Sequence, residues 1–145
     1  MATLEQAISI AALAHAGQVD KSGEPYILHP LRMMLRASPG DAQIVAMLHD
    51  VVEDTLWTLD ALREKGFSPN VLEAIEGVTK REGESYAEFV ARAAQHPVSR
   101  EVKLLDLEDN MNLLRLRGPL GEKDLARLAK YHSAWKTLHG GLLRK

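Results

Sequence analysis

The sequence contains no cysteine, which excludes a disulfide framework and any metal site built from thiolates. It also lacks an apolar run long enough to span a membrane, and its start, MATLEQAISI, is neither basic nor typical of a signal peptide. The formal net charge is only −2, so no excess of one sign indicates binding to nucleic acid or to anionic membranes. We therefore expect a cytoplasmic protein that binds neither nucleic acid nor membrane.

The chain also lacks internal repeats, linkers and low-complexity segments. Its 145 residues suit one domain with a substantial core, and 46% apolar with 26% charged residues is a normal globular balance. A single domain over residues 1–145 is expected.

Capping and breaking residues divide the chain into helices, and no segment alternates convincingly as a strand. Thr3 with Gln6 and Ser85 with Glu88 form capping-box pairs. The expected helices cover residues 3–17, 30–37, 41–54, 58–65, a segment from 68, 85–97, 99–117 and 122–138. The predicted fold class is all-α, a compact helical bundle.

The segment LHDVVEDT, residues 48–55, places a histidine and three acidic residues among apolar ones. On a helix turning by about 100° per residue, Asp50, Glu53 and Asp54 fall within an arc of about 140° on the side of His49. The opposite side carries apolar residues, namely Ile44, Val45, Leu48, Val51 and Val52. The helix is therefore expected to have two distinct faces.

The acidic face has two interpretations. It is either an ordinary solvated surface or part of a metal site. Solvated helix faces usually include lysine or arginine one turn away, but no basic residue occurs between Arg36 and Arg63. A divalent cation would relieve the repulsion among the carboxylates, which favours the metal site.

Further ligands would have to come from other segments. The candidates are His29, just before Pro30, and Asp106 in VKLLDLEDN. Lys103, Asp106 and Asn110 share a helix face within about 60°. Since a buried unpaired aspartate is costly, Asp106 is a metal ligand, a salt-bridge partner of Lys103, or exposed, and spacing alone leaves these open.

Together these residues resemble the HD phosphohydrolase superfamily, in which a histidine precedes a His-Asp pair and then a distant aspartate. The sequence is most similar to the hydrolase domain of RelA/SpoT-type proteins and to the small alarmone hydrolases. The motifs that carry the resemblance are AHAGQ (14–18), KSGEPYILHP (21–30), MLHDVVEDT (47–55) and VKLLDLEDNM (102–111).

The resemblance implies an HD-type domain that removes the 3′-pyrophosphate of guanosine tetra- or pentaphosphate, usually with Mn²⁺. It implies metal ligands His29, His49, Asp50 and Asp106. It also implies that Glu53 and Asp54 act on the attacking water, and that Lys21, Asn110 and Tyr131 contact the substrate. Two imidazoles with two carboxylates suit Mn²⁺, Fe²⁺ or Zn²⁺ better than Mg²⁺.

One position departs from the family pattern. Asp20 stands where the family typically has an arginine that packs on the guanine base, and an acid provides neither that stack nor attraction for phosphate. Adenine analogues of the alarmones, or another nucleotide cleaved by an HD-type nucleotidase, are therefore alternative substrates. A non-catalytic nucleotide-binding module is a further alternative. No synthetase domain follows, so we expect degradation of the nucleotide and not its synthesis.

Five other residues near these motifs are expected to have structural roles. His15 and Tyr26 are predicted to pack near the site without acting in it. His96 is predicted to interact with the end of the helix before it. Lys80, like Arg81 beside it, is predicted to lie in a solvated loop, with contact to phosphates as the alternative.

Overall fold

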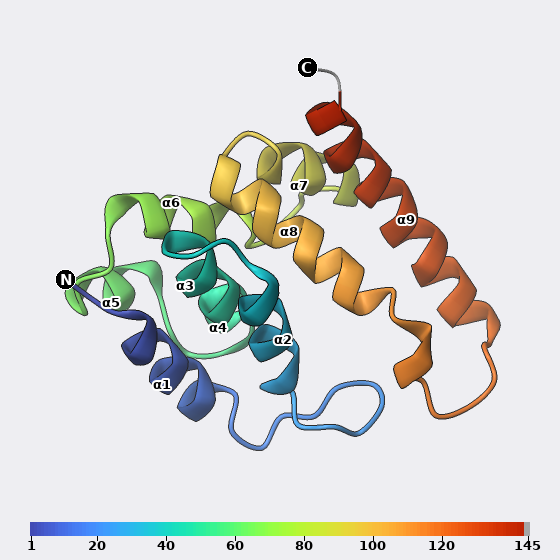
Figure 1. Cartoon of the computed structure of the whole chain (residues 1–145), viewed down its shortest axis with the longest axis horizontal. Coiled ribbons are helices and arrows are strands. Elements are labelled where there is room, and N and C mark those ends of the chain that lie inside the picture. Colours follow the sequence, from blue (N-terminus) through green and yellow to red (C-terminus); the bar gives the residue numbers. More distant parts are fainter. Residues whose placement is uncertain (144–145) are drawn as a thin grey trace.

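This computed structural model describes residues 1–143. Within that range the regular elements are helices, apart from one isolated bridge between Val19 and Pro25, which confirms the all-α prediction (Figure 1). The elements are α1 (Leu4–Ala14), α2 (Leu28–Arg36), α3 (Asp41–Leu48), α4 (Val51–Asp54), α5 (Leu59–Glu64), α6 (Pro69–Gly77), α7 (Tyr86–Ala93), α8 (Pro97–Asn110), the 3₁₀ helix η1 (Leu113–Arg115) and α9 (Glu122–Leu143). None of the helices described is both long and apolar enough to cross a membrane.

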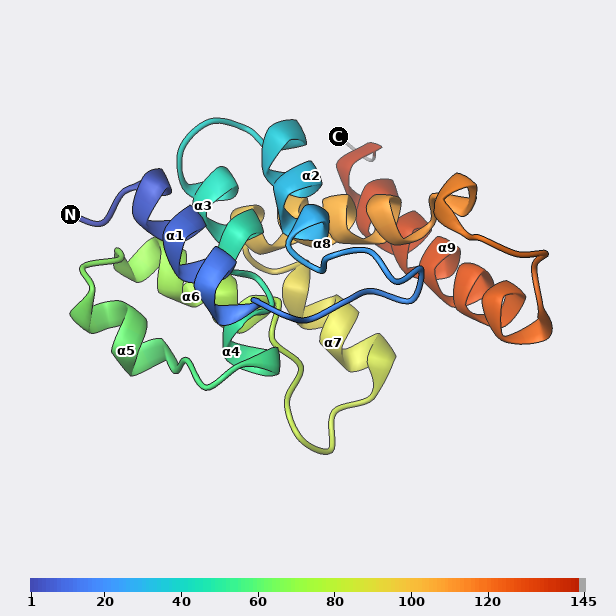
Figure 2. The same ribbon diagram turned by 90° about the horizontal axis from the view of Figure 1, so that it is seen from below.

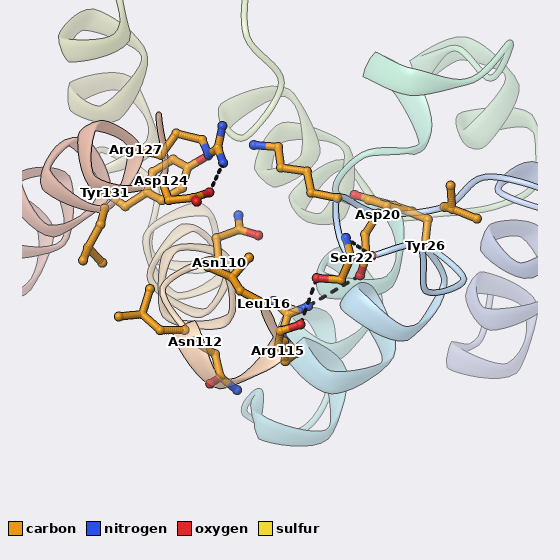
Figure 3. A pocket seen from close by; sticks show the side chains of 14 residues that line it. Asp20, Ser22, Tyr26, Asn110, Asn112, Arg115, Leu116, Asp124, Arg127 and Tyr131 are labelled. Carbon is orange, nitrogen blue, oxygen red and sulfur yellow. Dashed lines mark hydrogen bonds and ion pairs between the residues drawn. The ribbon is translucent and has the colours of Figure 1, made fainter. Parts of the chain in front are cut away.

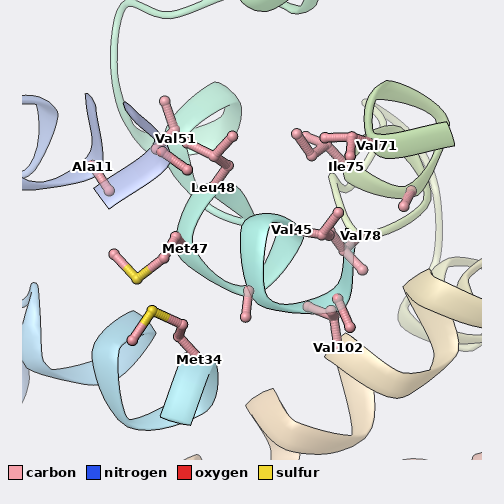
Figure 4. Packing of buried hydrophobic residues seen from close by; sticks show 14 of the residues in the cluster. Ala11, Met34, Val45, Met47, Leu48, Val51, Val71, Ile75, Val78 and Val102 are labelled. Carbon is pink, nitrogen blue, oxygen red and sulfur yellow. The ribbon is translucent and has the colours of Figure 1, made fainter. Parts of the chain in front are cut away.

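Helix α3 is the central element and packs against α1, α2, α6 and α8. Its buried residues are Ala42 and the run from Val45 to Leu48, and Figure 4 shows Met47 facing Met34 of α2 while Val45 faces Val78. Leu48, the last residue of α3, is also fully buried. Dense packing therefore fixes the backbone immediately before His49 and Asp50.

Helix α8 connects two hydrophobic clusters. Val102 and Leu105 belong to the cluster around α3, whereas Leu104 and Leu107 belong to a second cluster with α7 and α9. Asp106 lies between these buried positions, so packing on both sides of α8 fixes its place.

The segment between α1 and α2 extends away from α1 and lies beside η1 (Figures 1 and 2). The Ser22 hydroxyl donates to the Arg115 carbonyl at 3.0 Å, and the Arg117 guanidinium pairs with Glu24 at 3.4 Å. This loop therefore forms one wall of the space beside α8.

The predicted continuous helix over 41–54 is wrong, because the chain breaks into α3 and α4 at His49 and Asp50. His49 Nδ1 donates to the Ala46 carbonyl at 2.7 Å. In a continuous helix that carbonyl would accept the N–H of residue 50, which instead adopts φ −109° and ψ 1°. The imidazole therefore competes with the helix backbone at this point.

Helix α8 begins at Pro97, earlier than the predicted 99–117, and His96 caps its start. The His96 Nδ1 accepts the backbone N–H groups of Val98 and Ser99 at 3.1 and 3.5 Å. His96 thus begins α8 and does not act on the end of the preceding helix, contrary to expectation.

Helix α8 also ends earlier than predicted, at Asn110. The Arg115 guanidinium donates at 2.6 Å to the Asp109 carbonyl, which also accepts the Asn112 N–H at 3.3 Å where the helix ends. The Asn112 side chain then accepts the Leu114 N–H at 3.2 Å and begins η1. These side-chain contacts replace the last turns of the expected helix.

Close packing of α6 on α8 requires the glycine at position 77. A methyl group on Gly77 would overlap Ser99, which is fully buried and donates its hydroxyl to the Ala74 carbonyl at 2.8 Å. We expect Gly77→Ala to lower the free energy of unfolding by about 1–3 kcal/mol, measured by urea denaturation. Gly140→Ala is the matched control, because nothing lies within 4 Å of a methyl group there. Equal stability of the two variants would contradict this packing.

Candidate metal centre and substrate cleft

The four residues predicted as metal ligands lie together. His29 is in the first turn of α2, His49 and Asp50 join α3 to α4, and Asp106 lies on α8. His29 Nε2 is 2.9 Å from Asp106 Oδ1, and His49 Nε2 is 3.2 Å from Asp50 Oδ2 and 3.8 Å from Asp106 Oδ1. One ligand atom from each of His29, His49 and Asp50 fits within 4.8 Å of the others, close enough to hold a metal ion.

The bonding of His49 leaves one ring nitrogen available. Its Nδ1 faces the Ala46 carbonyl, which can only accept, so Nδ1 carries the proton. Its Nε2 is buried and has no hydrogen-bond partner among the residues described. Burial lowers the pKa of His49, but the carboxylates of Asp50 and Asp106 outweigh it and raise the pKa. The carboxylates around His49 Nε2 therefore favour a positive charge at this position.

His29 is oriented by a carboxylate that the sequence analysis did not select. Its Nδ1 lies 2.6 Å from Asp109 Oδ2, on the ring side opposite Asp106. Arg32 holds Asp109 through two hydrogen bonds of 2.8 and 2.9 Å. Burial opposes the charged form of His29, but Asp106 and Asp109 raise its pKa to about 9. An outer carboxylate that orients an imidazole in this way is typical of metal centres.

Asp106 lies in this cluster and forms a salt bridge with Lys103, which confirms one of its open interpretations, while its role as a metal ligand stays a prediction. Its Oδ2 accepts from Lys103 at 3.0 Å, and its Oδ1 accepts from Asn110 at 3.0 Å. Lys103 is only 8% exposed. Burial acts to raise the pKa of Asp106, but Lys103 and the two histidines hold it well below its usual range. Asp106 therefore stays ionised.

The acidic pair lies beside the cluster. Carboxylate oxygens of Asp50, Glu53 and Asp54 fall within 4.8 Å of one another, as the helical pattern predicted. Glu53 accepts the backbone N–H of Lys80 at 2.8 Å, which ties it to the loop after α6. Burial, together with Asp50 and Glu53, raises the pKa of Asp54 to about 6. Asp54 can therefore exchange a proton near neutral pH.

Tyr26 was predicted to be only a packing residue, and its hydroxyl makes that prediction incomplete. The ring packs between His15 and His29, with centroids 4.7 and 5.7 Å away, as expected for a packing residue. The hydroxyl, however, donates to Asp50 Oδ2. Burial and the neighbouring Asp50 raise the pKa of Tyr26, so it remains a donor. Tyr26 therefore helps to orient Asp50.

Two adjoining cavities open beside the cluster. The first, of about 310 Å³, lies between the loop before α2, the segment of η1, and α9 (Figure 3). The second, of about 510 Å³, is lined by His29 and by the carboxylates of Asp50, Glu53, Asp54 and Asp106. Residues lining both are Asp20, Lys21, Tyr26, Asn110, Arg115 and Tyr131. The three residues predicted to contact substrate are thus brought together where the cavities meet.

The second cavity carries charges of both signs. Its lining includes Lys21, Lys80, Lys103 and Lys130, together with the acidic residues Asp50, Glu53, Asp54 and Asp106. Burial lowers the pKa of Lys21, and the nearby positive charge of Arg127 lowers it further. Lysines in this lining can pair with the negative charges of an anion, and the carboxylates beside them can hold a cation.

Asp20, the position that departs from the family pattern, has a structural role. Its Oδ1 accepts the N–H groups of Ser22 and Glu24 at 2.8 and 3.0 Å, which forms the turn that presents Lys21. Its Oδ2 lies 3.5 Å from Arg115 Nη1. The structure therefore brings a guanidinium to this acid from a segment far along the chain, which the sequence did not indicate.

Comparison with known proteins agrees with this arrangement. A family model described as an HD domain matches residues 7–107. The guanosine-3′,5′-bis(diphosphate) 3′-pyrophosphohydrolase of Aquifex aeolicus is 33% identical over 123 residues, covering 77% of this chain and 18% of that protein. The bifunctional (p)ppGpp synthase/hydrolase SpoT of Escherichia coli K12 is 33% identical over 139 residues, covering 86% of this chain and 20% of that protein.

The chain spans about a fifth of the length of these curated relatives. A solved structure, titled "A metazoan ortholog of SpoT hydrolyzes ppGpp and plays a role in starvation responses", matches with a TM-score of 0.77. That match covers 95% of this chain and 85% of the other at 22% identity, and it supports the helical fold. Because the family model covers most of the chain and includes the histidine and aspartate cluster, this protein belongs to the HD-domain family.

Proposed function

We propose that this protein hydrolyses the 3′-pyrophosphate of alarmone nucleotides, either guanosine tetra- and pentaphosphate or their adenine analogues, and releases pyrophosphate. The main support is one arrangement. Two histidines and two aspartates converge beside a cavity whose lining contains both lysines and carboxylates. Relatives named as 3′-pyrophosphohydrolases of guanosine-3′,5′-bis(diphosphate) support the choice of substrate.

We assign His29, His49, Asp50 and Asp106 as ligands of a divalent cation, with Mn²⁺ expected and Fe²⁺ or Zn²⁺ as alternatives. The residues fit such an ion because Nε2 of His49 is buried, carries a lone pair and has no hydrogen-bond partner among the residues described. The carboxylates of Asp50 and Asp106 lie close to this nitrogen. A mixed set of imidazole and carboxylate ligands suits these metals. When bound, the cation supplies Lewis-acid chemistry, which makes water more nucleophilic and stabilises charge on phosphoryl oxygens.

Glu53 and Asp54 are assigned to the attacking water. Water attacks the phosphorus next to the ribose, the bond from that phosphorus to the 3′ oxygen breaks, and the water proton passes to a carboxylate. The 3′ oxygen then takes a proton from solvent. Asp54 is the better acceptor, because its carboxylate makes no hydrogen bond within residues 1–143, whereas Glu53 is held by Lys80. Tyr26 keeps Asp50 oriented during this step.

The two cavities accommodate the two ends of such a substrate. The second cavity, which lies beside the cluster and contains lysines, suits the pyrophosphate, with Lys21 as a point charge where the two cavities meet. The adjoining cavity, which Asn110 and Tyr131 share, suits the nucleoside. In this assignment Lys21, Asn110 and Tyr131 contact the substrate where its charged and aromatic parts join.

Pyrophosphate release tests the proposal. Guanosine and adenosine 3′-pyrophosphates would be compared with plain nucleoside triphosphates, each with Mn²⁺. We expect pyrophosphate from the 3′-pyrophosphates and no product from the triphosphates. Orthophosphate from ordinary nucleotides, with the alarmones intact, would retain the metal site but overturn the substrate. No product from either class would favour a module that binds nucleotide without catalysis.

A further inference from the structure

Arg115 occupies an unusual position at the junction of the two cavities. It belongs to η1, the element after α8, and it lines both cavities with 27% of its side chain exposed. Its Nη1 lies 3.5 Å from Asp20 Oδ2, and its Nη2 lies 2.6 Å from the Asp109 carbonyl and 3.4 Å from Asp109 Oδ2. Figure 3 shows the side chain beside Asp20 and Ser22, across the cavity from α9.

These contacts determine which part of the guanidinium a ligand can use. Nη2 donates to the Asp109 carbonyl, Nη1 forms an ion pair with Asp20, and the carboxylates of Asp20 and Asp109 offset the charge of the guanidinium. An arginine bonded in this way is a poor phosphate ligand, but its flat faces remain suited to stacking on an aromatic ring. The first cavity is also the more apolar side of the cleft, with Leu113, Leu116 and Leu128 in its lining.

We propose that Arg115 is the platform on which the purine base of the bound nucleotide stacks, and that Asp20 and Asp109 are the positioning residues that hold it. This inference rests on the proposed function for the identity of the ligand as a nucleotide. It gives Asp20 a role in nucleotide binding, since the acid fixes a guanidinium supplied by another segment. Because every base offers a flat face, the platform does not choose between guanine and adenine.

The test measures binding of the two expected products, GDP and inorganic pyrophosphate, by calorimetry with Mn²⁺. Wild type is expected to bind both. Arg115→Ala is expected to weaken GDP binding by about tenfold, the usual contribution of one stacked base, and to leave pyrophosphate binding unchanged. Arg115→Lys should weaken GDP binding as much as Arg115→Ala does, because lysine keeps the charge but has no flat face. ADP should show the same loss as GDP.

Arg117→Ala is the matched control, because Arg117 lies in the same segment and pairs with Glu24, with 70% of its side chain exposed. It should bind both products as wild type does. Normal GDP binding by Arg115→Lys, or equal weakening of both products by Arg115→Ala, would overturn the inference. Absence of GDP binding by wild type would overturn it as well.

Hydrolysis of guanosine tetraphosphate, measured separately, distinguishes this inference from the proposed function. Pyrophosphate release combined with GDP binding that is insensitive to Arg115 would refute the platform alone. GDP binding that depends on Arg115, in a protein that releases no pyrophosphate, would refute the reaction alone.

Discussion

Asp106→Asn is expected to remove Mn²⁺ binding and pyrophosphate release together, with turnover lower by about 100-fold or more. Asparagine keeps the size of the side chain but loses the charge that draws His29, Lys103 and a divalent cation to one point. Equilibrium dialysis with Mn²⁺ and a pyrophosphate assay on the same preparation measure both effects. Full metal content with full turnover would remove Asp106 from the metal site.

Loss of folding must be separated from loss of the metal in this experiment. Asp106→Asn leaves the buried Lys103 without its carboxylate, and an uncompensated buried charge costs about 3–5 kcal/mol. The double variant Lys103→Met with Asp106→Asn removes both charges and should recover stability in a thermal melt. We expect it to remain without metal. If the double variant binds Mn²⁺ as wild type does, the effect of Asp106→Asn belongs to folding.

Asp54→Asn is expected to lower turnover by about 10²-fold or more while Mn²⁺ stays bound, as for the loss of a general base. The reason is position: Asp54 lies with Asp50 and Glu53 beside the cluster, and its carboxylate is free of other hydrogen bonds within the described residues. Metal content and turnover number are measured on the purified variant. If Asp54→Asn releases the metal, Asp54 is a ligand and its assignment as a base is wrong.

Glu53→Gln provides the comparison for Asp54→Asn. Glutamine retains an oxygen that can accept the Lys80 N–H, so the loop after α6 should keep its place. We expect Mn²⁺ to be retained and turnover to fall less than in Asp54→Asn. A greater loss in Glu53→Gln would make Glu53 the principal base.

The break within the central motif shows where sequence patterns reach their limit. The pattern of residues 41–54 correctly placed Asp50, Glu53 and Asp54 near one another. It did not predict the separation of α3 from α4, because that depends on one bond from the His49 imidazole to the Ala46 carbonyl. Periodicity counts side chains around an axis and does not detect a side chain that takes a backbone acceptor.

The residues that the sequence did not reveal all act through long-range contacts. Asp109 meets His29 from 80 positions away, and Tyr26 reaches Asp50 across 24. The spacing of Asp106 and Asp109, three apart on one helix, was a usable indication that both face the same site. Arg115 gave no such indication, because it was expected in a helix that ends before it.

We propose that this protein cleaves the bond between the 3′ oxygen of the ribose and its pyrophosphate with help from a divalent cation. The most direct test treats wild-type protein with a chelator and then incubates it with guanosine tetraphosphate, with and without added Mn²⁺. Phosphorus NMR identifies the products. We predict equal amounts of pyrophosphate and GDP, formed only after Mn²⁺ is added. Orthophosphate as the first product, or the same products formed without any metal, would contradict the account.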